Sequence, residues 1–410
     1  MRKRRGKSKE YNLAKIRVIG VGGAGCNAVS RMFESMPRGV ELIAINTDVQ
    51  DLNHTRVRKK IQIGKGVTRG LGTGMDPELG RQAAEENRSD IAQALEGADM
   101  IFITAGFGGG SGTGGAPIIA EVAQEMGILT VAVVTKPFGF EGAKRAQIAE
   151  EGFAKIKDRV DTLITIPNDR IFSMVDKDTP LIKAFEAIDE VLKNSVLGIA
   201  ELITIPGTIN IDFADVKTII KDGGVAMIGI GLASGPDRSV AAANLALNSP
   251  LIEVSIEGAK SILFTIAGHR DLKMNEVNEI AKIIAENVDP GAKIIFGTHH
   301  VRKLRKGQIK VTLVATGFNG ILTRSNLFPN LSSMSSVKKS AESNRGEEVS
   351  VMSFDSKRVP PLVRMEDRPR SLKEATLFDE RLSAKPGPVR HEKEEWDIPA
   401  FLRKKKRRVR

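Results

Sequence analysis

The sequence predicts an α/β protein with a Rossmann-like parallel-sheet domain, one long central helix and a second, α+β domain. In the first half of the 410-residue chain, short and nearly continuous apolar runs alternate with helix-like stretches. Such runs are typical of parallel strands that helices cover on both faces. A long amphipathic stretch follows at 181–203, and apolar runs resume beyond it. This order of elements predicts two folded domains connected by a helix.

Five apolar runs predict the strands of the first domain, which we expect over residues 14–180. These strands are Ile16–Val21, Glu41–Asn46, Met100–Thr104, Ile128–Thr135 and Thr162–Pro167. Residues 204–322 are expected to form the second domain. Its predicted strands are Val225–Leu232, Ser261–Ala267, Lys293–Phe296 and Ile309–Ala315, and its predicted helix is Met274–Asn287.

The stretch at 181–203 predicts a single helix between the two domains. Its apolar residues, from Leu181 to Ile203, recur at the spacing of one buried helical face. We expect Thr179 to be the N-cap and Pro180 to occupy the first helical position, where a missing amide donor costs little.

The net charge of the chain is concentrated at its two ends. Residues 1–10 hold six Lys or Arg and one Glu, a net +5, and residues 403–410 hold seven Lys or Arg, a net +7. These sum to the +12 of the whole chain, so the residues between are neutral overall, and no specific nucleic-acid partner is expected. Residues 1–13 are interpreted as a basic disordered arm. Weak contact of both basic ends with anionic lipid is an alternative to a purely solvated role.

The composition changes again from Arg324 onward. This part has seven of the seventeen prolines but two of the forty glycines, with clusters of Ser and charge. It cannot bury enough apolar surface to offset the entropy of ordering, so 323–390 is expected to be a disordered linker. Residues 391–410 are the tail, in which Trp396–Leu402 is a short apolar island with the single tryptophan. An apolar motif on a flexible tether is typical of a partner-docking peptide.

Cysteine usage and hydropathy indicate the reducing cytoplasm. Cys26 is the single cysteine, so an internal disulfide is excluded. The longest apolar runs, such as Ile128–Val134, are far shorter than the roughly 18 residues that a membrane span needs, and no apolar segment follows the basic start as in a signal peptide. The five histidines are scattered, so no protein-held metal centre is expected.

Two glycine-rich loops carry the chemistry. The first, Gly20–Gly25, fits G-x-G-x-x-G after a strand and before a helix, where backbone amides can approach phosphate. Alone it is a weak signal, because an NAD(P)-dependent oxidoreductase would have the same motif, and a tight turn without a ligand is a further alternative. The second, Gly106–Gly115, has seven glycines in ten residues. Because glycine costs conformational entropy, this density indicates backbone N–H groups that wrap an anion, with the Ser111 and Thr113 hydroxyls as further donors.

The second loop closely resembles the signature G-G-G-[ST]-G-[ST]-G of the tubulin/FtsZ family of GTPases. Other motifs are similar to FtsZ proteins in the same order along the chain. They are Asn46–Asp48, Thr68–Gly74, Thr135–Phe138 with Phe140–Gly142, Ile166–Asp169, Asn210–Val216 and the tail motif Asp397–Arg403. The resemblance covers about 14–320 and 396–403 and implies the fold described above.

The resemblance also implies which residues hold the nucleotide, GTP or GDP. The positions that match are Gly22, Gly23, Ala24, Gly25, Cys26, Asn27, Asn46, Gly72, Thr73, Gly74, Gly109, Gly110, Ser111, Gly112, Thr113, Gly114, Glu141, Arg145, Asn168, Phe185 and Asp189. Asp189 would accept from the N1–H and exocyclic amine of guanine. From the residues alone, Phe185 can also be a core side chain, and Asp189 and Glu141 can be solvated charges. Cys26 departs from the small residue common at this position in the family and is interpreted as a filler.

Asp212 and Asp215 allow two interpretations. From the residues alone, Asp215 is most simply the N-cap of a helix Val216–Lys221. The resemblance instead implies that Asp212, Asp215 and Asn210 are catalytic, and that they reach the GTP of the next subunit. The two carboxylates would orient the attacking water, while Mg²⁺, held mainly by the nucleotide phosphates, and backbone amides stabilise the developing charge.

By resemblance, the chain is a polymerising GTPase of bacterial cell division that assembles head to tail at the midcell ring, on the inner face of the membrane. Its tail would bind membrane-tethering division proteins such as FtsA. The alternative is an oxidoreductase that binds NAD(P) on the first loop. That alternative predicts an acidic residue at the end of the second strand, where the sequence has Asn46 and Thr47. A scaffold that binds nucleotide without hydrolysis would be expected to lack Asp212 or Asp215.

Overall fold

The structure is a computed structural model that describes residues 14–37, 39–171, 178–252, 256–301 and 304–318. The predicted arm at 1–13, the linker at 323–390 and the tail at 391–410, including Trp396–Leu402, lie outside the described residues. Within the described ranges, no helix combines the length and the apolar character that crossing a membrane requires.

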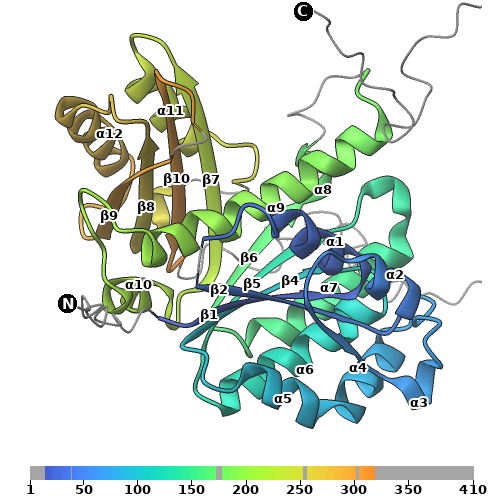
Figure 1. Ribbon diagram of the computed structural model, residues 1–410. Coiled ribbons are helices and arrows are strands. Elements are labelled where there is room, and N and C mark those ends of the chain that lie inside the picture. The colour runs from blue at the N-terminus through green and yellow to red at the C-terminus, as the bar shows by residue number, and fades with distance from the viewer. Residues whose placement is uncertain (1–13, 38, 172–177, 253–255, 302–303, 319–410) are drawn as a thin grey trace, which may run out of the picture. The chain divides into compact units, whose positions relative to one another are not determined.

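Ten strands form one sheet in the order β3-β2-β1-β4-β5-β6-β7-β10-β8-β9 (Figure 1). The first six strands are β1 (Ile16–Val21), β2 (Val40–Asn46), β3 (Lys59–Gln62), β4 (Met100–Gly106), β5 (Leu129–Lys136) and β6 (Thr162–Pro167), and all are parallel. The others are β7 (Gly224–Ser234), β8 (Ser261–Gly268), β9 (Lys293–His300) and β10 (Gln308–Thr316). β10 is antiparallel to β7 and β8, whereas β7 continues the parallel sheet beside β6.

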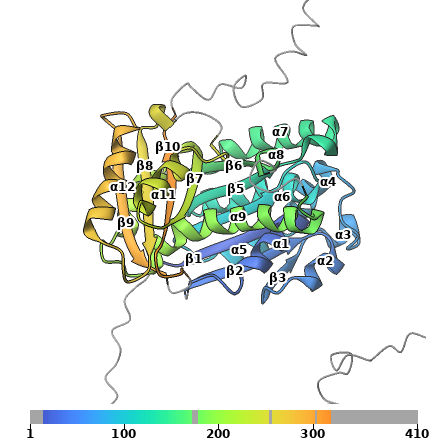
Figure 2. The same ribbon diagram turned by 90° about the horizontal axis from the view of Figure 1, so that it is seen from above.

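Helices cover both faces of the parallel part (Figures 1 and 2). They are α1 (Gly22–Met32), α2 (Val49–His54), α3 (Lys65–Thr68), α4 (Pro77–Glu86), α5 (Arg88–Leu95), α6 (Ser111–Glu125), α7 (Ala143–Lys157), α8 (Asn168–Ile171), α9 (Leu181–Thr204) and α10 (Phe213–Ile220), with α11 (Arg238–Leu247) and α12 (Met274–Glu286) on the second domain.

The core divides according to the alternation of strand side chains. Val18 of β1 packs in a cluster with residues of α1, α9 and α10, whereas its neighbour Ile19 packs with residues of α5, α6 and α7. Strand side chains point alternately to the two faces of a sheet, so strands covered on both sides are apolar throughout. A third cluster, around Phe264, lies between the second-domain strands and α11 and α12. The predicted α/β class and the two-domain architecture are therefore confirmed.

The central helix α9 connects the two domains, as predicted, but it begins differently. Its N-cap is Pro180, whose backbone is extended (φ −56°, ψ 143°), and no side chain caps the helix. The expectation that Thr179 is the cap is therefore wrong, because the chain becomes helical only after the proline. At about 1.5 Å per residue, the 24 residues of α9 span about 36 Å.

Two further elements differ from expectation. The edge strand β3 was not predicted, because its sequence, Lys-Lys-Ile-Gln, has one apolar residue and its strand character comes from pairing with β2. Helix α10 begins at Phe213 and not at Val216, and its N-cap is Asp212, whose Oδ1 accepts from the Asp215 backbone N–H at 2.8 Å. The interpretation of Asp215 as the cap is therefore wrong, since Asp215 lies in the first turn.

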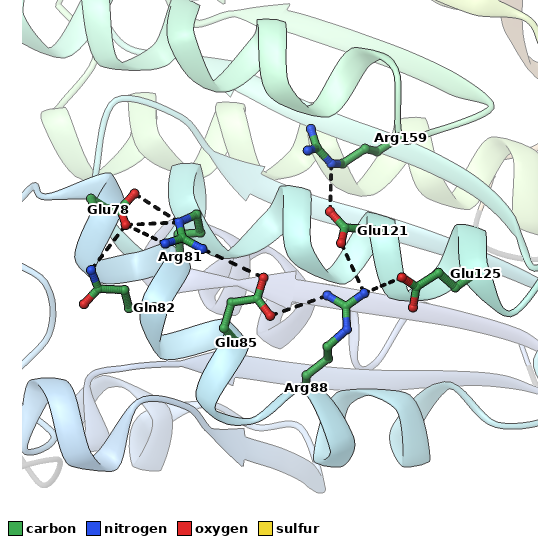
Figure 3. A network of polar contacts seen from close by, with 8 residues as sticks. All are labelled: Glu78, Arg81, Gln82, Glu85, Arg88, Glu121, Glu125 and Arg159. Atoms are coloured by element: carbon green, nitrogen blue, oxygen red, sulfur yellow. Dashed lines mark hydrogen bonds and ion pairs between the residues drawn. The ribbon is translucent and has the colours of Figure 1, made fainter.

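A chain of ion pairs joins the helices on one face of the first domain (Figure 3). Arg88 contacts Glu85, Glu121 and Glu125, and Glu121 also contacts Arg159 beyond the end of α7. At its other end, hydrogen bonds from Arg81 and Gln82 lower the pKa of Glu78 to about 2. Ion pairs between exposed side chains contribute little to stability, so the network orders the surface of α4 to α7 more than it determines stability.

Candidate functional site

A cavity of about 620 Å³ lies at the carboxyl ends of the parallel strands. Its walls come from the loops that follow β1, β4, β5 and β6 and from the first half of α9. It is lined by Val21, Gly22, Gly23, Ala24, Asn27, Arg31, Thr73, Gly106, Phe107, Gly109, Gly110, Ser111, Gly112, Thr135, Pro137, Phe140, Glu141, Arg145, Asn168, Phe185, Ile188, Asp189 and Leu192. The carboxyl ends of an open parallel sheet are where such folds bind ligands.

The two glycine loops pack directly against each other. Gly22 has φ +69°, and a Cβ built on it would lie 2.8 Å from the Gly112 backbone nitrogen. Behind it, a Cβ on Gly25 would lie 2.3 Å from the carbonyl oxygen of Thr104, at the end of β4. These glycines therefore allow the start of α1, the end of β4 and the start of α6 to meet at backbone distance, which places two helix N-termini at one cavity.

The second loop leads into α6, whose first residue is Ser111. The Ser111 hydroxyl lies 2.6 Å from the Thr47 hydroxyl and 3.2 Å from that of Thr73. Gly109 faces open space, because a Cβ on it would meet nothing within 4 Å. A helix N-terminus, the amides of a glycine-rich loop and a hydroxyl cluster together suit a polyanion.

Thr113 has a different position from the one expected. Its hydroxyl accepts a hydrogen bond from the Gly108 N–H at 3.0 Å, so it closes the loop on itself and does not line the cavity. Gly114 is also behind the lining, where a Cβ would lie 2.0 Å from the Pro77 carbonyl oxygen. Both residues shape the loop from the protein side.

The loop 69–75 forms one rim. Five of its residues, Arg69, Gly70, Gly72, Gly74 and Met75, have positive φ, a backbone that glycine adopts most easily. Thr73 lines the cavity, whereas Gly72 and Gly74 do not. Leu71 is 82% exposed at the tip of this rim.

The opposite rim holds further hydrogen-bonding groups. Glu141 accepts from the Phe138 N–H at 3.0 Å and pairs with Arg145, and both side chains line the cavity. Asn168 is buried beside them, and its Oδ1 has no hydrogen-bond partner among the described residues. Asp169 accepts from the Gly139 N–H at 3.0 Å, which fixes the loop rather than the cavity wall. Asn168 thus combines a place in the cavity lining with a buried oxygen that lacks a partner in the described part of the chain, which is uncommon for buried polar atoms.

Where α9 lines the cavity, the wall consists of aromatic side chains and one carboxylate. Phe185 is 44% exposed, so it is not the core residue that helical periodicity alone allowed. Its ring stands edge-on to Phe138 at 5.9 Å between centroids, and Phe140 stacks on Phe138 at 4.9 Å. Asp189 lies beside them, with Oδ2 held by Arg31 Nε at 2.7 Å. Burial raises the pKa of Asp189 to about 6, and the positive charge of Arg31 opposes that rise.

Phe140 and Arg31 also line the cavity, although neither was predicted as a site residue. Phe140 was read as part of a motif and not as a side chain of the site. Arg31 could have been found from spacing, because it lies four residues after Asn27 on α1 and therefore on the same helical face. It is also the single charged side chain of that helix.

Several expected contacts do not reach the cavity. The predicted residues outside its lining are Gly25, Cys26, Asn46, Gly72, Gly74, Thr113 and Gly114. Cys26 is fully buried in the core, where burial raises the pKa of its thiol to about 12, so it is a filler and not a ligand. Asn46 donates to Asp51 at 2.7 Å and accepts from the Thr47 N–H at 2.8 Å, so it fixes the loop from behind.

Asp212, Asp215 and Asn210 lie far from the cavity. They are exposed in the loop and first turn around the start of α10, beyond the far end of α9. Asp189 and Thr204 are separated by fifteen residues of helix, or about 22 Å. Figure 1 shows α10 beside the C-terminal end of α9, opposite the end that lies near α8. The predicted catalytic group and the cavity are thus at opposite ends of the same molecule.

Two family models match the chain. The Tubulin/FtsZ family, GTPase domain, matches residues 15–176, and the FtsZ family, C-terminal domain, matches residues 224–319. Among solved structures, an FtsZ dimer from M. jannaschii is 46% identical, with a TM-score of 0.72, over 75% of this chain and 89% of that chain. CetZ1 from Haloferax volcanii, a GDP-bound monomer, shares the fold at 22% identity and a TM-score of 0.66, over 80% of this chain and 99% of that chain.

The fold, the paired glycine loops and these matches define the class of protein: a tubulin-like, cytoskeletal GTPase, which binds guanine nucleotide and hydrolyses GTP. Within that class, the chain belongs to the FtsZ family. The oxidoreductase alternative is set aside, because both loops line one cavity and the GTPase-domain match includes them both.

Proposed function

We propose that this chain polymerises head to tail in cell division and hydrolyses GTP at the contact between successive subunits. The observation that carries the proposal is the separation of the cavity from Asp212 and Asp215. The cavity would bind the nucleotide, and the exposed carboxylates of the next subunit would complete it. The 46% identical protein from M. jannaschii is described as a dimer, which supports self-association.

The charged side chains that line the cavity support a site that lacks its own catalytic carboxylate. Its two lining carboxylates each have a cation beside them: Glu141 pairs with Arg145, and Asp189 pairs with Arg31. Asp189 lies at the aromatic end, away from the phosphate loops, where it suits the guanine edge. Neither carboxylate is a free base beside the expected γ-phosphate. This supports a water-orienting carboxylate that comes from outside the cavity.

In this proposal the loops 22–27 and 109–114 bind the phosphates, with loop 70–75 at the γ-phosphate. Asn168, Glu141 and Arg145 bind the sugar and phosphate, and Phe185 and Asp189 bind the base. Asp212 and Asp215, with Asn210, orient the attacking water. Phosphoryl transfer depends chiefly on positioning and electrostatic stabilisation, so residues on a neighbour can supply a large part of the rate.

Mg²⁺ fits this arrangement as a nucleotide-held ion. Among the residues that the structure describes, no three His, Cys, Asp or Glu side chains come together to hold a metal. The hydroxyl cluster of Ser111, Thr47 and Thr73 offers oxygen atoms beside the phosphate loop. Mg²⁺ commonly binds substrate phosphates with few protein ligands, and when bound it would neutralise phosphate charge.

We extend the proposal to the parts of the chain that carry sequence signals alone. Residues 14–180 would be the GTP-binding domain, 181–203 the central helix and 204–322 the domain with the catalytic loop. The linker 323–390 would tether Trp396–Leu402, which would bind a membrane-tethering division protein such as FtsA, with weak lipid contact by the basic ends. The protein would then act in the cytoplasm, at the midcell ring on the inner face of the membrane.

The proposal is tested by light scattering at 90° together with phosphate release. The full chain should assemble with GTP and Mg²⁺, and it should fail to assemble with GDP or ATP. Hydrolysis per molecule should rise with protein concentration above a threshold, because a lone subunit has an incomplete site. Hydrolysis per molecule that stays constant down to high dilution would contradict the proposal.

A further inference from the structure

We propose that Arg31 is the positioning residue for base recognition: its guanidinium orients the Asp189 carboxylate and keeps it charged for the guanine edge. This inference rests on the proposed function, in which Asp189 binds guanine. Arg31 itself needs no contact with the base, since its effect acts through the carboxylate. The partner of the carboxylate is the part of the base that distinguishes guanine from adenine, the N1–H with the exocyclic amine.

The geometry links two helices across the cavity wall. Arg31 lies in the last turn of α1, and Asp189 lies in the first half of α9. Arg31 Nε holds Asp189 Oδ2 at 2.7 Å, and its terminal nitrogen reaches Glu186 at 3.6 Å. Both Arg31 and Asp189 line the cavity. The contact occupies one lone pair of Oδ2, so Oδ1 and the second lone pair of Oδ2 remain for two donors of a ligand.

The charges around Asp189 show why it needs this partner. Its side chain is 14% exposed, and burial raises its pKa to about 6. Arg31 lowers that pKa and Glu186 raises it, and these are the charged groups that act on Asp189 among the described residues. Across the cavity, Glu141 and Arg145 pair with each other. Without Arg31, burial and Glu186 would act unopposed, and Asp189 would be protonated at a higher pH.

A protonated carboxyl is a poorer acceptor for the two guanine donors, because it has lost its charge and one of its oxygens now carries a hydrogen. Loss of Arg31 should therefore weaken nucleotide binding most at low pH. An opposite charge within about 4–6 Å typically changes a carboxyl pKa by about 1–3. At a pH below the pKa, a rise of one unit in the pKa lowers the fraction of ionised Asp189 by up to about tenfold.

The test compares Arg31→Gln, Arg31→Lys and wild type in GDP binding by calorimetry between about pH 5.5 and pH 8, a range that brackets the expected titration of Asp189. GDP avoids hydrolysis. The titration of its phosphates cancels in the ratio of variant to wild-type affinity. Arg56→Gln is the matched control, because Arg56 is an exposed arginine that pairs with Glu34 and does not line the cavity.

We expect Arg31→Gln to bind within a few-fold of wild type at pH 8 and about tenfold more weakly at pH 6. Arg31→Lys should restore most of the low-pH affinity, since it keeps the charge, and Arg56→Gln should match wild type throughout. A ratio that does not change with pH, or a loss in Arg31→Lys equal to that in Arg31→Gln, would overturn the role of Arg31.

A separate arm distinguishes failure of this inference from failure of the proposed function. Asp189→Ala should lose the preference for GDP over ADP. If that preference survives, Asp189 does not recognise guanine, and the inference fails together with the assignment of the base site. If the preference is lost but the Arg31→Gln ratio is independent of pH, the inference about Arg31 alone is wrong.

Discussion

Gly22 and Gly112 face each other so closely that a Cβ on Gly22 would lie 2.8 Å from the Gly112 backbone nitrogen. One residue opens α1 and the other lies in the first turn of α6, so this contact sets the two glycine-rich loops side by side. The glycines of the loops are therefore of two kinds. Some allow backbone to approach backbone, and others leave the cavity open.

Substitutions should separate these two kinds of glycine. Gly109 has ordinary backbone angles and open space around it, so Gly109→Asp should fold with a thermal midpoint near wild type. Its carboxylate would point into the phosphate site, and GTP binding should fall by at least about tenfold, since like charges repel. Gly22→Ala should instead lose folded protein, because it has both positive φ and a backbone clash. Circular dichroism melts and GTP titrations check both, and normal GTP binding by Gly109→Asp would contradict this view of the loop.

The two carboxylates near α10 should have separable effects. Asp212 caps the helix, so Asp212→Ala should cost about 0.5–2 kcal/mol of unfolding free energy as well as activity. Asp215 accepts no capping bond, so Asp215→Ala should retain the wild-type stability and GTP affinity while turnover falls about 10²–10⁴-fold. Urea unfolding and phosphate release measure the two effects. Wild-type turnover by Asp215→Ala would show that this residue is not catalytic.

The buried carboxylate of Asp189 should make stability depend on pH in the nucleotide-free protein. Burial raises its folded-state pKa to about 6, above the model-peptide value of 3.8, so the folded state binds the proton more tightly than the unfolded state. This group therefore destabilises the fold above pH 6, and the penalty disappears as pH falls toward 4. Asp189→Asn removes the titration.

Asp189→Asn should therefore be more stable relative to wild type at pH 8 than at pH 4.5. The difference between the two changes in unfolding free energy should be on the order of 1–2 kcal/mol, once water access to the side chain is allowed for. Chemical denaturation at the two values of pH measures the difference, with Asp51→Asn as a second raised carboxyl for comparison. A difference of the opposite sign would contradict the raised pKa.

The tail should be separable from polymerisation. A chain that ends at residue 390 keeps both matched domains but lacks Trp396–Leu402. We expect it to assemble and hydrolyse GTP at close to the full rate, and to lose binding to its membrane-tethering partner. Sedimentation with GTP and fluorescence localisation in cells check the two halves. If the truncated chain lost GTP hydrolysis, the tail would be required for catalysis, and this prediction would be wrong.

The strands and the glycine loops could be predicted because their signals are local. Apolar runs and glycine density depend on neighbouring residues, and β1 and β6 have the predicted bounds. The edge strand β3 could not be predicted, since pairing with β2 and not its own residues makes it a strand. Asp215 was predicted as the N-cap of α10, whereas the cap is Asp212, three residues earlier. Either aspartate could cap a helix, and the sequence does not determine where this helix starts.

The site was harder to predict than the fold, because lining depends on which way a side chain points. Cys26 directly follows the first glycine loop, in α1, but faces the core. Thr113 lies in the second loop, but its hydroxyl bonds back to Gly108. Arg31 and Phe140 belong to no phosphate-loop motif, yet both line the cavity. Such orientations follow from tertiary packing, which motif matching does not contain.

The central claim, a catalytic site divided between two subunits, is tested most directly by mixing two inactive variants. Asp215→Ala should bind GTP but offer its neighbour a defective catalytic loop. Gly109→Asp should keep an intact catalytic loop but bind GTP at least about tenfold more weakly, so the mixture is assayed at a GTP concentration that leaves the Gly109→Asp site largely empty. In a mixed filament, the GTP of an Asp215→Ala subunit can meet the intact loop of a Gly109→Asp subunit. We predict that an equimolar mixture shown to co-sediment hydrolyses GTP well above the sum of the two variants measured alone. Co-sedimentation with no gain in phosphate release would contradict the divided site.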